Sequence, residues 1–355
     1  MQSRTIAPEK TPERERYYQR LHQYGLAPLW ERLNILLTPE PQVRSTACLW
    51  DYDLTRNLLL ESATVISAHE AERRVLILDN PGLNGSSAIT ETLYAGWQLV
   101  MPGEIAPAHR HSPSALRFIL EGDGRAYTSV NGEKAYMSPG DLILTPSGEW
   151  HDHGNEGGAP VVWLDVLDLP LIRNIGSIFL DLYPEDQYPN SAPPGASRAR
   201  FGAGMMPVNR SVSSPNSPTF HYPYETARKA LVETAHSMKA DEAYGIRLEY
   251  VNPLTGGPAL ATISTFLQWM PSGYSSQRYR TTEGMVFSVV EGRGSLVIRA
   301  GDAEVRFDWK PRDAFVIPCW AEHEWNVSDE AILFAASDRG IQQRSGIWRE
   351  QRVKA

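Results

Sequence analysis

An internal repeat is the feature of this sequence that most restricts its fold. The segment "WQLVMPGEIAPAHRH" (97–111) aligns with "LQWMPSGYSSQRYRT" (267–281), and "FILEGDGRAYTSVNG" (118–132) aligns with "SVVEGRGSLVIRAGD" (288–302). Gln98 matches Gln268, and Glu121, Gly122 and Gly124 match residues 291, 292 and 294, each 170 positions later. A sequence that repeats a unit of this size predicts tandem copies of one domain.

The repeated unit has the pattern of β structure. Short apolar runs such as "LYAGWQLVMP", "LRFILEGDG" and "DLILTP" are separated by Gly and Pro. Asn131-Gly132 is a strong hairpin signal. This spacing is typical of an all-β sandwich or barrel. Most of the first eighty residues instead have helical spacing, with Thr11 as a predicted N-cap and Pro12 at the first helical position.

The two copies differ at their histidines. The segment "PGDLILTPSGEWHDHGN" (139–155) aligns with "PRDAFVIPCWAEHEWN" (311–326), so that His151 matches His323. Three other histidines of the first copy have no counterpart, since Tyr279, Thr281 and Trp325 replace His109, His111 and His153. Any metal chemistry is therefore expected in the first copy.

The spacing of these histidines predicts a metal site. Residues i and i+2 of a strand point to the same face, so His109 and His111 can direct two imidazoles into one barrel interior. His151 comes about forty residues later, after a turn marked by Pro146 and Gly148. Three neutral imidazoles on one side of a metal leave other positions open, and imidazole suits Fe, Zn, Cu or Ni.

Arg117 is an even number of positions after His111, so we expect it to face the same interior. A guanidinium group matches a carboxylate in bidentate fashion. Phe287 replaces Arg117 in the second copy, which favours a functional role for the arginine.

The motifs "PGEIAPAHRH" and "PGDLILTPSGEWHDHGN" resemble the first and second cupin motifs. Most cupins add a glutamate ligand shortly after HxH, whereas "SPSALRF" here has no carboxylate. This departure, the "WHDHGN" segment, the helical N-terminus and the degenerate second copy together resemble the gentisate 1,2-dioxygenase family. That family includes the salicylate and 1-hydroxy-2-naphthoate ring-cleaving dioxygenases.

The resemblance implies a mainly β bicupin: two tandem double-stranded β-helix (jelly-roll) barrels with an N-terminal helical segment. The expected ranges are a helical segment at 1–88, a metal-binding cupin at 89–182, a linker with a helix at 183–258, a degenerate cupin at 259–338 and a C-terminal tail at 339–355.

The resemblance also implies one Fe(II) per chain, held by His109, His111 and His151. The substrate would be a 2-hydroxybenzoate that O2 opens between the carboxyl-bearing and hydroxyl-bearing carbons. Gentisate is the first candidate, followed by salicylate or a 5-substituted salicylate. Zinc cannot serve, because it has no redox chemistry.

Several further residues take their expected roles from the resemblance. Gln98 would line the substrate pocket, His153 would bond the substrate or move a proton, and Asp165 would orient a hydroxyl or a histidine. Arg73 would bind substrate, although adjacent Arg74 is an alternative from the residues alone.

Tyr94 and Gly96 precede Gln98 at even steps and share its face. Tyr94 is expected to wall the aromatic ring. Gly96 is expected to leave space that widens substrate choice beyond gentisate.

Alternative functions are a 1-hydroxy-2-naphthoate dioxygenase, a metal-dependent isomerase or decarboxylase on the same barrel, and a bicupin binding protein. With 42 acidic and 34 basic residues the net charge is −8, which disfavours nucleic acid as a partner. No apolar run reaches membrane-spanning length. Two cysteines and a polar N-terminus favour the cytoplasm, and the resemblance suggests a homotetramer.

Overall fold

The computed structural model describes residues 11–209, 214–301 and 303–353, and the chain divides into two units at Gln42 and Val43. The first unit holds α1 (Pro12–Gln23) and α2 (Leu29–Leu36), neither of which buries a residue. Helix α1 begins as predicted, because the Thr11 side chain accepts a hydrogen bond from the Arg14 backbone N–H and Pro12 is the first helical residue.

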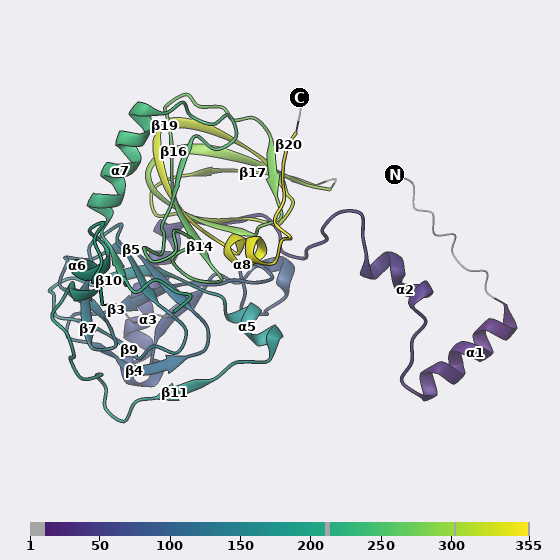
Figure 1. Cartoon of the computed structure of the whole chain (residues 1–355), viewed down its shortest axis with the longest axis horizontal. Helices are drawn as coiled ribbons and strands as arrows, with labels where there is room; N and C mark the ends of the chain where they lie inside the picture. Colours follow the sequence, from purple (N-terminus) through teal and green to yellow (C-terminus); the bar gives the residue numbers. More distant parts are fainter. Residues whose placement is uncertain (1–10, 210–213, 302, 354–355) are drawn as a thin grey trace. The chain divides into compact units, whose positions relative to one another are not determined.

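The second unit contains two β-barrels (Figure 1). The first barrel is formed by a six-stranded and a five-stranded antiparallel sheet. The strand order of the larger sheet is β12 (His221–Tyr222), β8 (Leu142–Thr145), β5 (Ala115–Glu121), β10 (Val161–Leu167), β3 (Tyr94–Val100) and β2 (Arg74–Ile77). That of the smaller is β11 (Leu180–Leu182), β4 (Ile105–His111), β9 (His151–Asn155), β6 (Ala126–Val130) and β7 (Glu133–Tyr136).

The second barrel is one nine-stranded sheet, and the predicted mainly β fold is confirmed. Its strands are β1 (Cys48–Trp50), β13 (Ile246–Glu249), β14 (Ser264–Met270), β15 (Tyr279–Thr281), β16 (Met285–Ala300), β17 (Ala303–Trp309), β18 (Ala314–Ile317), β19 (Glu322–Ser337) and β20 (Glu350–Arg352). The predicted hairpin connects β6 and β7, with Asn131 and Gly132 both at positive φ.

Short helices occupy the connections. They are α3 (Tyr52–Val65), α4 (Ala68–Ala71), the 3-10 turn η1 (Pro81–Leu83), α5 (Leu169–Ile175), α6 (Ala196–Phe201), α7 (Tyr224–Ser237) and α8 (Arg339–Arg344). Helix α7, which was expected from its sequence, packs beside β13 and β14 of the second barrel. In the part of the chain that the structure describes, no helix is long and apolar enough to cross a membrane.

The two barrels exchange their first strands. Strand β1, which precedes the first barrel in sequence, pairs with β18 of the second, and β12 pairs with β8 of the first. Strands β2 and β12 therefore lie outside the range 89–182 that the sequence suggested for the first barrel. The physical reason is that strand pairing across a long connection leaves no local sequence pattern.

A continuous apolar core joins the barrels. Phe118 of β5 stacks on Phe334 of β19 with ring centroids 4.1 Å apart, and both rings are buried. The second barrel packs against the β5 side of the first barrel. Polar residues of the first barrel's interior lie on the other side, on β4 and β9.

Candidate metal centre

Two neighbouring strands of the first barrel bring together three histidines. Strand β4 carries His109 and His111, and β9 carries His151 directly opposite His109. The ring centroids lie 4.1 Å apart for His109 and His151, and 4.9 Å apart for His111 and His151. One potential ligand atom from each histidine lies within 4.8 Å of the others. Among the described residues this is the one group of three or more His, Cys, Asp or Glu side chains that could hold a metal ion.

Backbone carbonyls fix the tautomer of all three rings. Nδ1 contacts the carbonyl of Pro107 at 2.8 Å for His109, of Pro113 at 2.7 Å for His111, and of Glu149 at 2.9 Å for His151. Because a carbonyl can only accept, each Nδ1 carries the proton and each Nε2 keeps a free lone pair. The Nε2 of His151 is buried and has no hydrogen-bond partner. The group consists of three histidines and includes no carboxylate. Three imidazole nitrogens fit a divalent transition metal.

Burial holds the three imidazoles neutral. It lowers the pKa of His109 to about 2 and that of His111 to about 4, with the charges of Arg73 and Arg117 adding to the effect. The pKa of His151 also falls well below its usual value, mainly through burial. A neutral ring binds a metal without first releasing a proton, so the geometry and the protonation state agree.

A cavity of about 290 Å³ opens beside His109 and His111. It is lined by Arg73, Val75, Tyr94, Gln98, His109, His111, Pro113, Arg117, Asp165, Leu167, Leu169, Ile178, Phe179 and Leu180. A larger cavity of about 620 Å³ lies near α6 and α7, but its lining includes none of the three clustered histidines. Chemistry, rather than size, therefore identifies the smaller cavity as the site.

The structure separates the two adjacent arginines. Arg74 donates from Nη1 and Nη2 to the carboxylate of Glu104 at 2.8 and 2.9 Å, away from the cavity. Arg73 lines the cavity, and burial lowers the pKa of its guanidinium while Asp165 opposes that shift. Arg73 is thus the one of the pair whose charge faces the histidines.

Arg117 and Asp165 lie opposite each other on β5 and β10. Their closest charged atoms, Nε and Oδ1, are 3.5 Å apart, and both residues are almost fully buried. Burial raises the pKa of Asp165 to about 6, although the Arg117 charge acts in the opposite direction.

Gln98, Tyr94 and Gly96 follow one another on the cavity side of β3. The amide Nε2 of Gln98 is buried without a hydrogen-bond partner, so it remains available as a donor. A Cβ atom at Gly96 would lie 2.6 Å from Val75 Cγ1 and 3.1 Å from the Tyr94 hydroxyl oxygen. The space beside Gly96 is therefore occupied by these two side chains rather than open.

His153 lies one layer deeper than the cavity wall. Its Nδ1 is 2.9 Å from Thr128 Oγ1, its Nε2 is buried and unpartnered, and its ring is 5.8 Å from that of His151. Thr128 Oγ1 donates to Met137 Sδ at 3.6 Å, which leaves Thr128 as the acceptor from His153 Nδ1. The Nε2 of His153 then keeps a free lone pair that can accept a hydrogen bond, while burial lowers the pKa of the ring well below its usual value.

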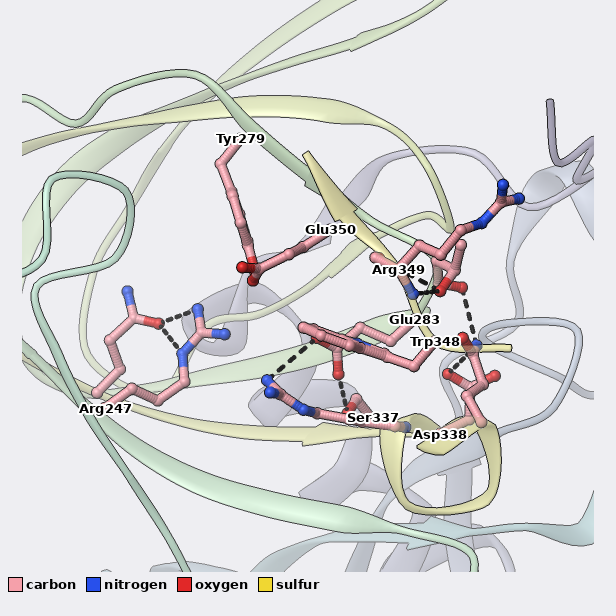
Figure 2. Close-up of polar contacts among 12 residues, drawn as sticks. Arg247, Tyr279, Glu283, Ser337, Asp338, Trp348, Arg349 and Glu350 are labelled. Carbon is pink, nitrogen blue, oxygen red and sulfur yellow. Dashed lines mark hydrogen bonds and ion pairs between the residues drawn. The ribbon is translucent and has the colours of Figure 1, made fainter. Parts of the chain in front are cut away.

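The equivalent region of the second barrel holds a network of polar contacts in place of the histidine triad (Figure 2). Tyr279, which replaces His109, donates its hydroxyl to Glu350 at 2.7 Å. Arg247 donates from Nε and Nη2 to Gln268 Oε1 at 2.9 and 2.6 Å, and Ser337 donates to Glu283 at 2.6 Å. His323 keeps the same tautomer through the Ala321 carbonyl but has no histidine neighbours that could complete a triad.

Comparison with known proteins places this arrangement in a family. A cupin domain model matches residues 96–167. A gentisate 1,2-dioxygenase from Aquipseudomonas alcaligenes is 46% identical over 98% of this chain and 99% of that relative. A 5-aminosalicylate 1,2-dioxygenase from Comamonas sp. is 34% identical over 93% of this chain and 88% of the relative. The crystal structure of salicylate 1,2-dioxygenase from Pseudoaminobacter salicylatoxidans with gentisate superposes with a TM-score of 0.90 at 29% identity, covering 99% of this chain and 97% of that chain.

The chain belongs to the gentisate 1,2-dioxygenase family. It is accordingly a dioxygenase with a bicupin fold, and the predicted family and enzyme class are confirmed. In this dioxygenase the histidine triad is the residue set suited to bind the metal, and the open side of the triad faces the cavity.

Sequence reasoning did not identify one wall of the cavity. Ile178, Phe179 and Leu180 follow α5 and form a strap that returns to pair with β4, with Leu180 opposite His111. Their side chains line the cavity and are also 43–51% exposed. The signal that could have revealed the strap is the repeat itself, since β20 returns to β15 in the same way in the second barrel.

Proposed function

We propose that this dioxygenase uses Fe(II) and O2 to open the ring of gentisate between its carboxyl-bearing and hydroxyl-bearing carbons. The observation that carries the proposal is the convergence of three unprotonated Nε2 atoms with the cations Arg73 and Arg117 around one cavity. A 2-hydroxybenzoate offers a carboxylate for the cations and two oxygens that a metal can bind side by side.

Two of the relatives and one solved structure support a single-ring substrate, while another relative, 32% identical, is named for 1-hydroxy-2-naphthoate. The first two are named for gentisate and 5-aminosalicylate, and the structural relative is a salicylate 1,2-dioxygenase that holds gentisate. The cavity, about 290 Å³, is at the small end of the range for ligand sites, which favours one ring over two. Gentisate is the first candidate, and salicylate or a 5-substituted salicylate is the second.

The two arginines divide the task of binding the carboxylate. Arg73 has no ion-pair partner among the described residues, so an incoming carboxylate would supply its counter-charge. Arg117 is already beside Asp165, which keeps its guanidinium in place before the substrate arrives. A cation oriented in advance loses little side-chain freedom when the ligand binds.

Three further residues would act on the substrate hydroxyl. Gln98 Nε2 would donate to a substrate oxygen, and the unpartnered His153 Nε2 would accept a hydrogen bond rather than a proton, because burial lowers the pKa of this ring well below its usual value. Asp165, with a pKa of about 6, would hold Arg117 rather than the substrate at neutral pH. Tyr94 would pack against the ring, with a hydroxyl that burial keeps protonated by raising its pKa.

Iron held by His109, His111 and His151 would supply the redox chemistry that lets O2 react with the aromatic ring. The apolar strap side chains Ile178, Phe179 and Leu180 would exclude water from the ring as it opens.

The test is anaerobic reconstitution with Fe(II), followed by oxygen-electrode assays with gentisate, salicylate, a 5-substituted salicylate and 1-hydroxy-2-naphthoate. We expect iron-dependent oxygen uptake that is fastest with gentisate, together with the ultraviolet absorbance of the ring-opened acid. Protein that carries one iron per chain and consumes no oxygen with any of the four would contradict the proposal.

We further propose a cytoplasmic homotetramer. The helices α1 and α2 bury no residue and expose large apolar side chains, including Tyr17 at 40% and Ile35 at 78% exposure. Such surfaces are typical of association sites. Light scattering of the full chain should give four times the mass of 39.7 kDa, and a monomeric mass would contradict it.

A further inference from the structure

The guanidinium of Arg117 is clamped from two sides. Nη1 donates to Thr145 Oγ1 at 2.8 Å, and Nε lies 3.5 Å from Asp165 Oδ1. The same Asp165 oxygen accepts a hydrogen bond from the indole Nε1–H of Trp163 at 2.9 Å. All four residues are buried, with exposures of 5% or less. Nε makes no hydrogen bond to Asp165 at this distance, so the Arg117 N–H groups other than the one bound to Thr145 are left for a ligand in the cavity.

The polarity of the Thr145 contact is fixed by the backbone. Thr145 lies opposite Ala115 in the β5–β8 pairing and donates its hydroxyl hydrogen to the Ala115 carbonyl at 3.3 Å. Its lone pairs are thus directed to Arg117, which has no acceptor capacity of its own. Thr145 supplies a neutral acceptor that holds the guanidinium without cancelling its charge.

The second barrel provides an internal comparison. Phe287 is equivalent to Arg117 and pairs with Ala335, as Arg117 pairs with Asp165, so Ala335 takes the place of Asp165. Met285 pairs with Ile317, as Ala115 pairs with Thr145, so Ile317 takes the place of Thr145. Trp163 pairs with Gln98 in the first barrel, and Leu333 pairs with Gln268 in the second. Leu333 therefore takes the place of Trp163. All four members of the clamp are apolar in the barrel that lacks the histidine triad, whereas the glutamine is kept in both.

We infer that Thr145 and Trp163 are positioning residues, which orient Arg117 and Asp165 so that the guanidinium meets the substrate carboxylate. The inference rests on the proposed function, in which Arg117 binds that carboxylate. Recognition of a carboxylate by arginine depends on the plane of the guanidinium. Loss of the Thr145 acceptor would let that plane rotate and would leave a buried N–H without a partner.

The experiment compares Thr145→Val, which keeps the side-chain shape and removes the hydroxyl, with Thr145→Ser, which keeps the hydroxyl. Dissociation constants are measured anaerobically on the iron-loaded enzyme by tryptophan fluorescence, with gentisate and with its neutral amide. For Thr145→Val we expect gentisate to bind about tenfold more weakly and its KM to rise in step. Binding of the amide should stay within about twofold. Thr145→Ser should restore most of the gentisate affinity.

Thr265→Val is the matched control, because Thr265 is a buried threonine of the second barrel whose hydroxyl has no hydrogen-bond partner. It should leave both dissociation constants unchanged. If Thr145→Val does not fold, Trp163→Phe removes the indole N–H from Asp165 and should weaken gentisate binding selectively in the same way.

Two results would overturn the inference. One is unchanged gentisate affinity in Thr145→Val, and the other is an equal loss for gentisate and the amide, which indicates a structural effect alone. Failure of the proposed function is a separate outcome, because it would show as wild-type enzyme that carries iron and consumes no oxygen.

Discussion

At the residue scale, the duplication supplies a control for the metal-binding histidines. His151 and His323 occupy matching positions, are both 1% exposed, and have unpartnered Nε2 atoms. They differ in their neighbours, since His151 faces two histidines and His323 faces Tyr279. An isolated imidazole is a weak metal site, whereas three convergent ones chelate.

We therefore expect His151→Ala to lose the metal and His323→Ala to keep it. After anaerobic loading and desalting, iron in His151→Ala should fall below about one tenth of the wild-type content, and oxygen uptake should fall at least about a hundredfold. His323→Ala should retain iron and show only the modest destabilisation of a buried truncation. Equal iron contents in the two variants would contradict the assignment of His151 as a ligand.

Gly96 carries the second prediction at this scale. An added methyl would lie 2.6 Å from Val75 Cγ1 and 3.1 Å from both the Tyr94 hydroxyl and the Leu76 carbonyl. Because the two side chains must give way, Gly96→Ala should displace Tyr94 toward the cavity and narrow the set of accepted substrates.

The measurement is the ratio of kcat/KM for gentisate and salicylate, which should change by about fivefold or more in Gly96→Ala. Gly158→Ala is the control, since a Cβ there would meet nothing within 4 Å. A substrate profile identical to that of the wild type would remove Gly96 from the specificity determinants.

The residues that could be predicted are those with a spacing rule. His109, His111 and Arg117 lie at even intervals, so the two-residue period of a strand brought them to one face. Thr145 follows no such rule, because its partner Arg117 is 28 positions away and only the strand register brings the two into contact. Trp163 shares a strand face with Asp165, two positions later, but a tryptophan on a buried strand is ordinary and did not stand out in the sequence.

At the element scale, each repeat contributes one strand to the barrel of the other repeat, and the N-terminus of the helix that follows this strand hydrogen-bonds to that barrel. The Tyr52 N–H at the beginning of α3 donates to Asp313 Oδ1 at 3.0 Å, and the Tyr224 N–H at the beginning of α7 donates to Asp141 Oδ1 at 2.9 Å. Asp141 also accepts from His221 Nε2 of β12, and Asp313 from Lys310 Nζ, each at 2.9 Å. The two carboxylates therefore fasten one repeat to the other.

Asp141→Ala and Asp313→Ala should each destabilise the whole second unit. Each change removes a bond to a helix start and at least two further hydrogen bonds from a buried carboxylate. We expect a loss of about 2–4 kcal/mol in the free energy of unfolding. Denaturant unfolding should show one transition, displaced similarly in both variants.

Asp181→Ala is the comparison, because the ion pair between Asp181 of β11 and Arg110 of β4 is exposed and contributes at most about 1 kcal/mol. Separate transitions for the two barrels would show that the exchanged strands do not couple them.

This exchange explains why the sequence indicated two barrels but not which strands belong to each barrel. The repeats predict the strands of each barrel from local alternation and turns, and α7 from its helical spacing. The bond between Tyr52 and Asp313 joins residues 261 positions apart, and strand β12 is only two residues long. Neither feature has a local signature, so the first-barrel bounds drawn from the sequence omit β12.

At the scale of the whole molecule, the two barrels meet through a reciprocal pair of buried acids. Thr92 of the first repeat donates its hydroxyl to Asp338 of the second at 2.9 Å, and Thr262 of the second donates to Asp168 of the first at 2.5 Å. The same acids accept backbone N–H groups, from Gly284 for Asp338 and from Ser114 for Asp168. Burial raises the pKa of both acids to about 6.

These raised pKa values predict how stability depends on pH. An unfolded aspartate has a pKa near 3.9, so the folded state holds a proton on Asp338 that the unfolded state has released. The stabilisation from that proton is complete below about pH 4 and is lost as pH rises through about 6. A shift of roughly two pKa units corresponds to about 3 kcal/mol.

Asp338→Asn cannot ionise and should escape this loss. The free energy of unfolding of the variant, relative to the wild type, should therefore improve between pH 4.5 and 7.5, by about 2 kcal/mol. Asp168→Asn should behave alike. Denaturant unfolding at the two pH values measures the difference. The prediction is contradicted if the difference in unfolding free energy between wild type and Asp338→Asn stays the same at the two pH values. Asp338 would then already be ionised in the folded protein at acid pH, because its hydrogen bonds from Thr92 and Gly284 outweigh the cost of burying its charge.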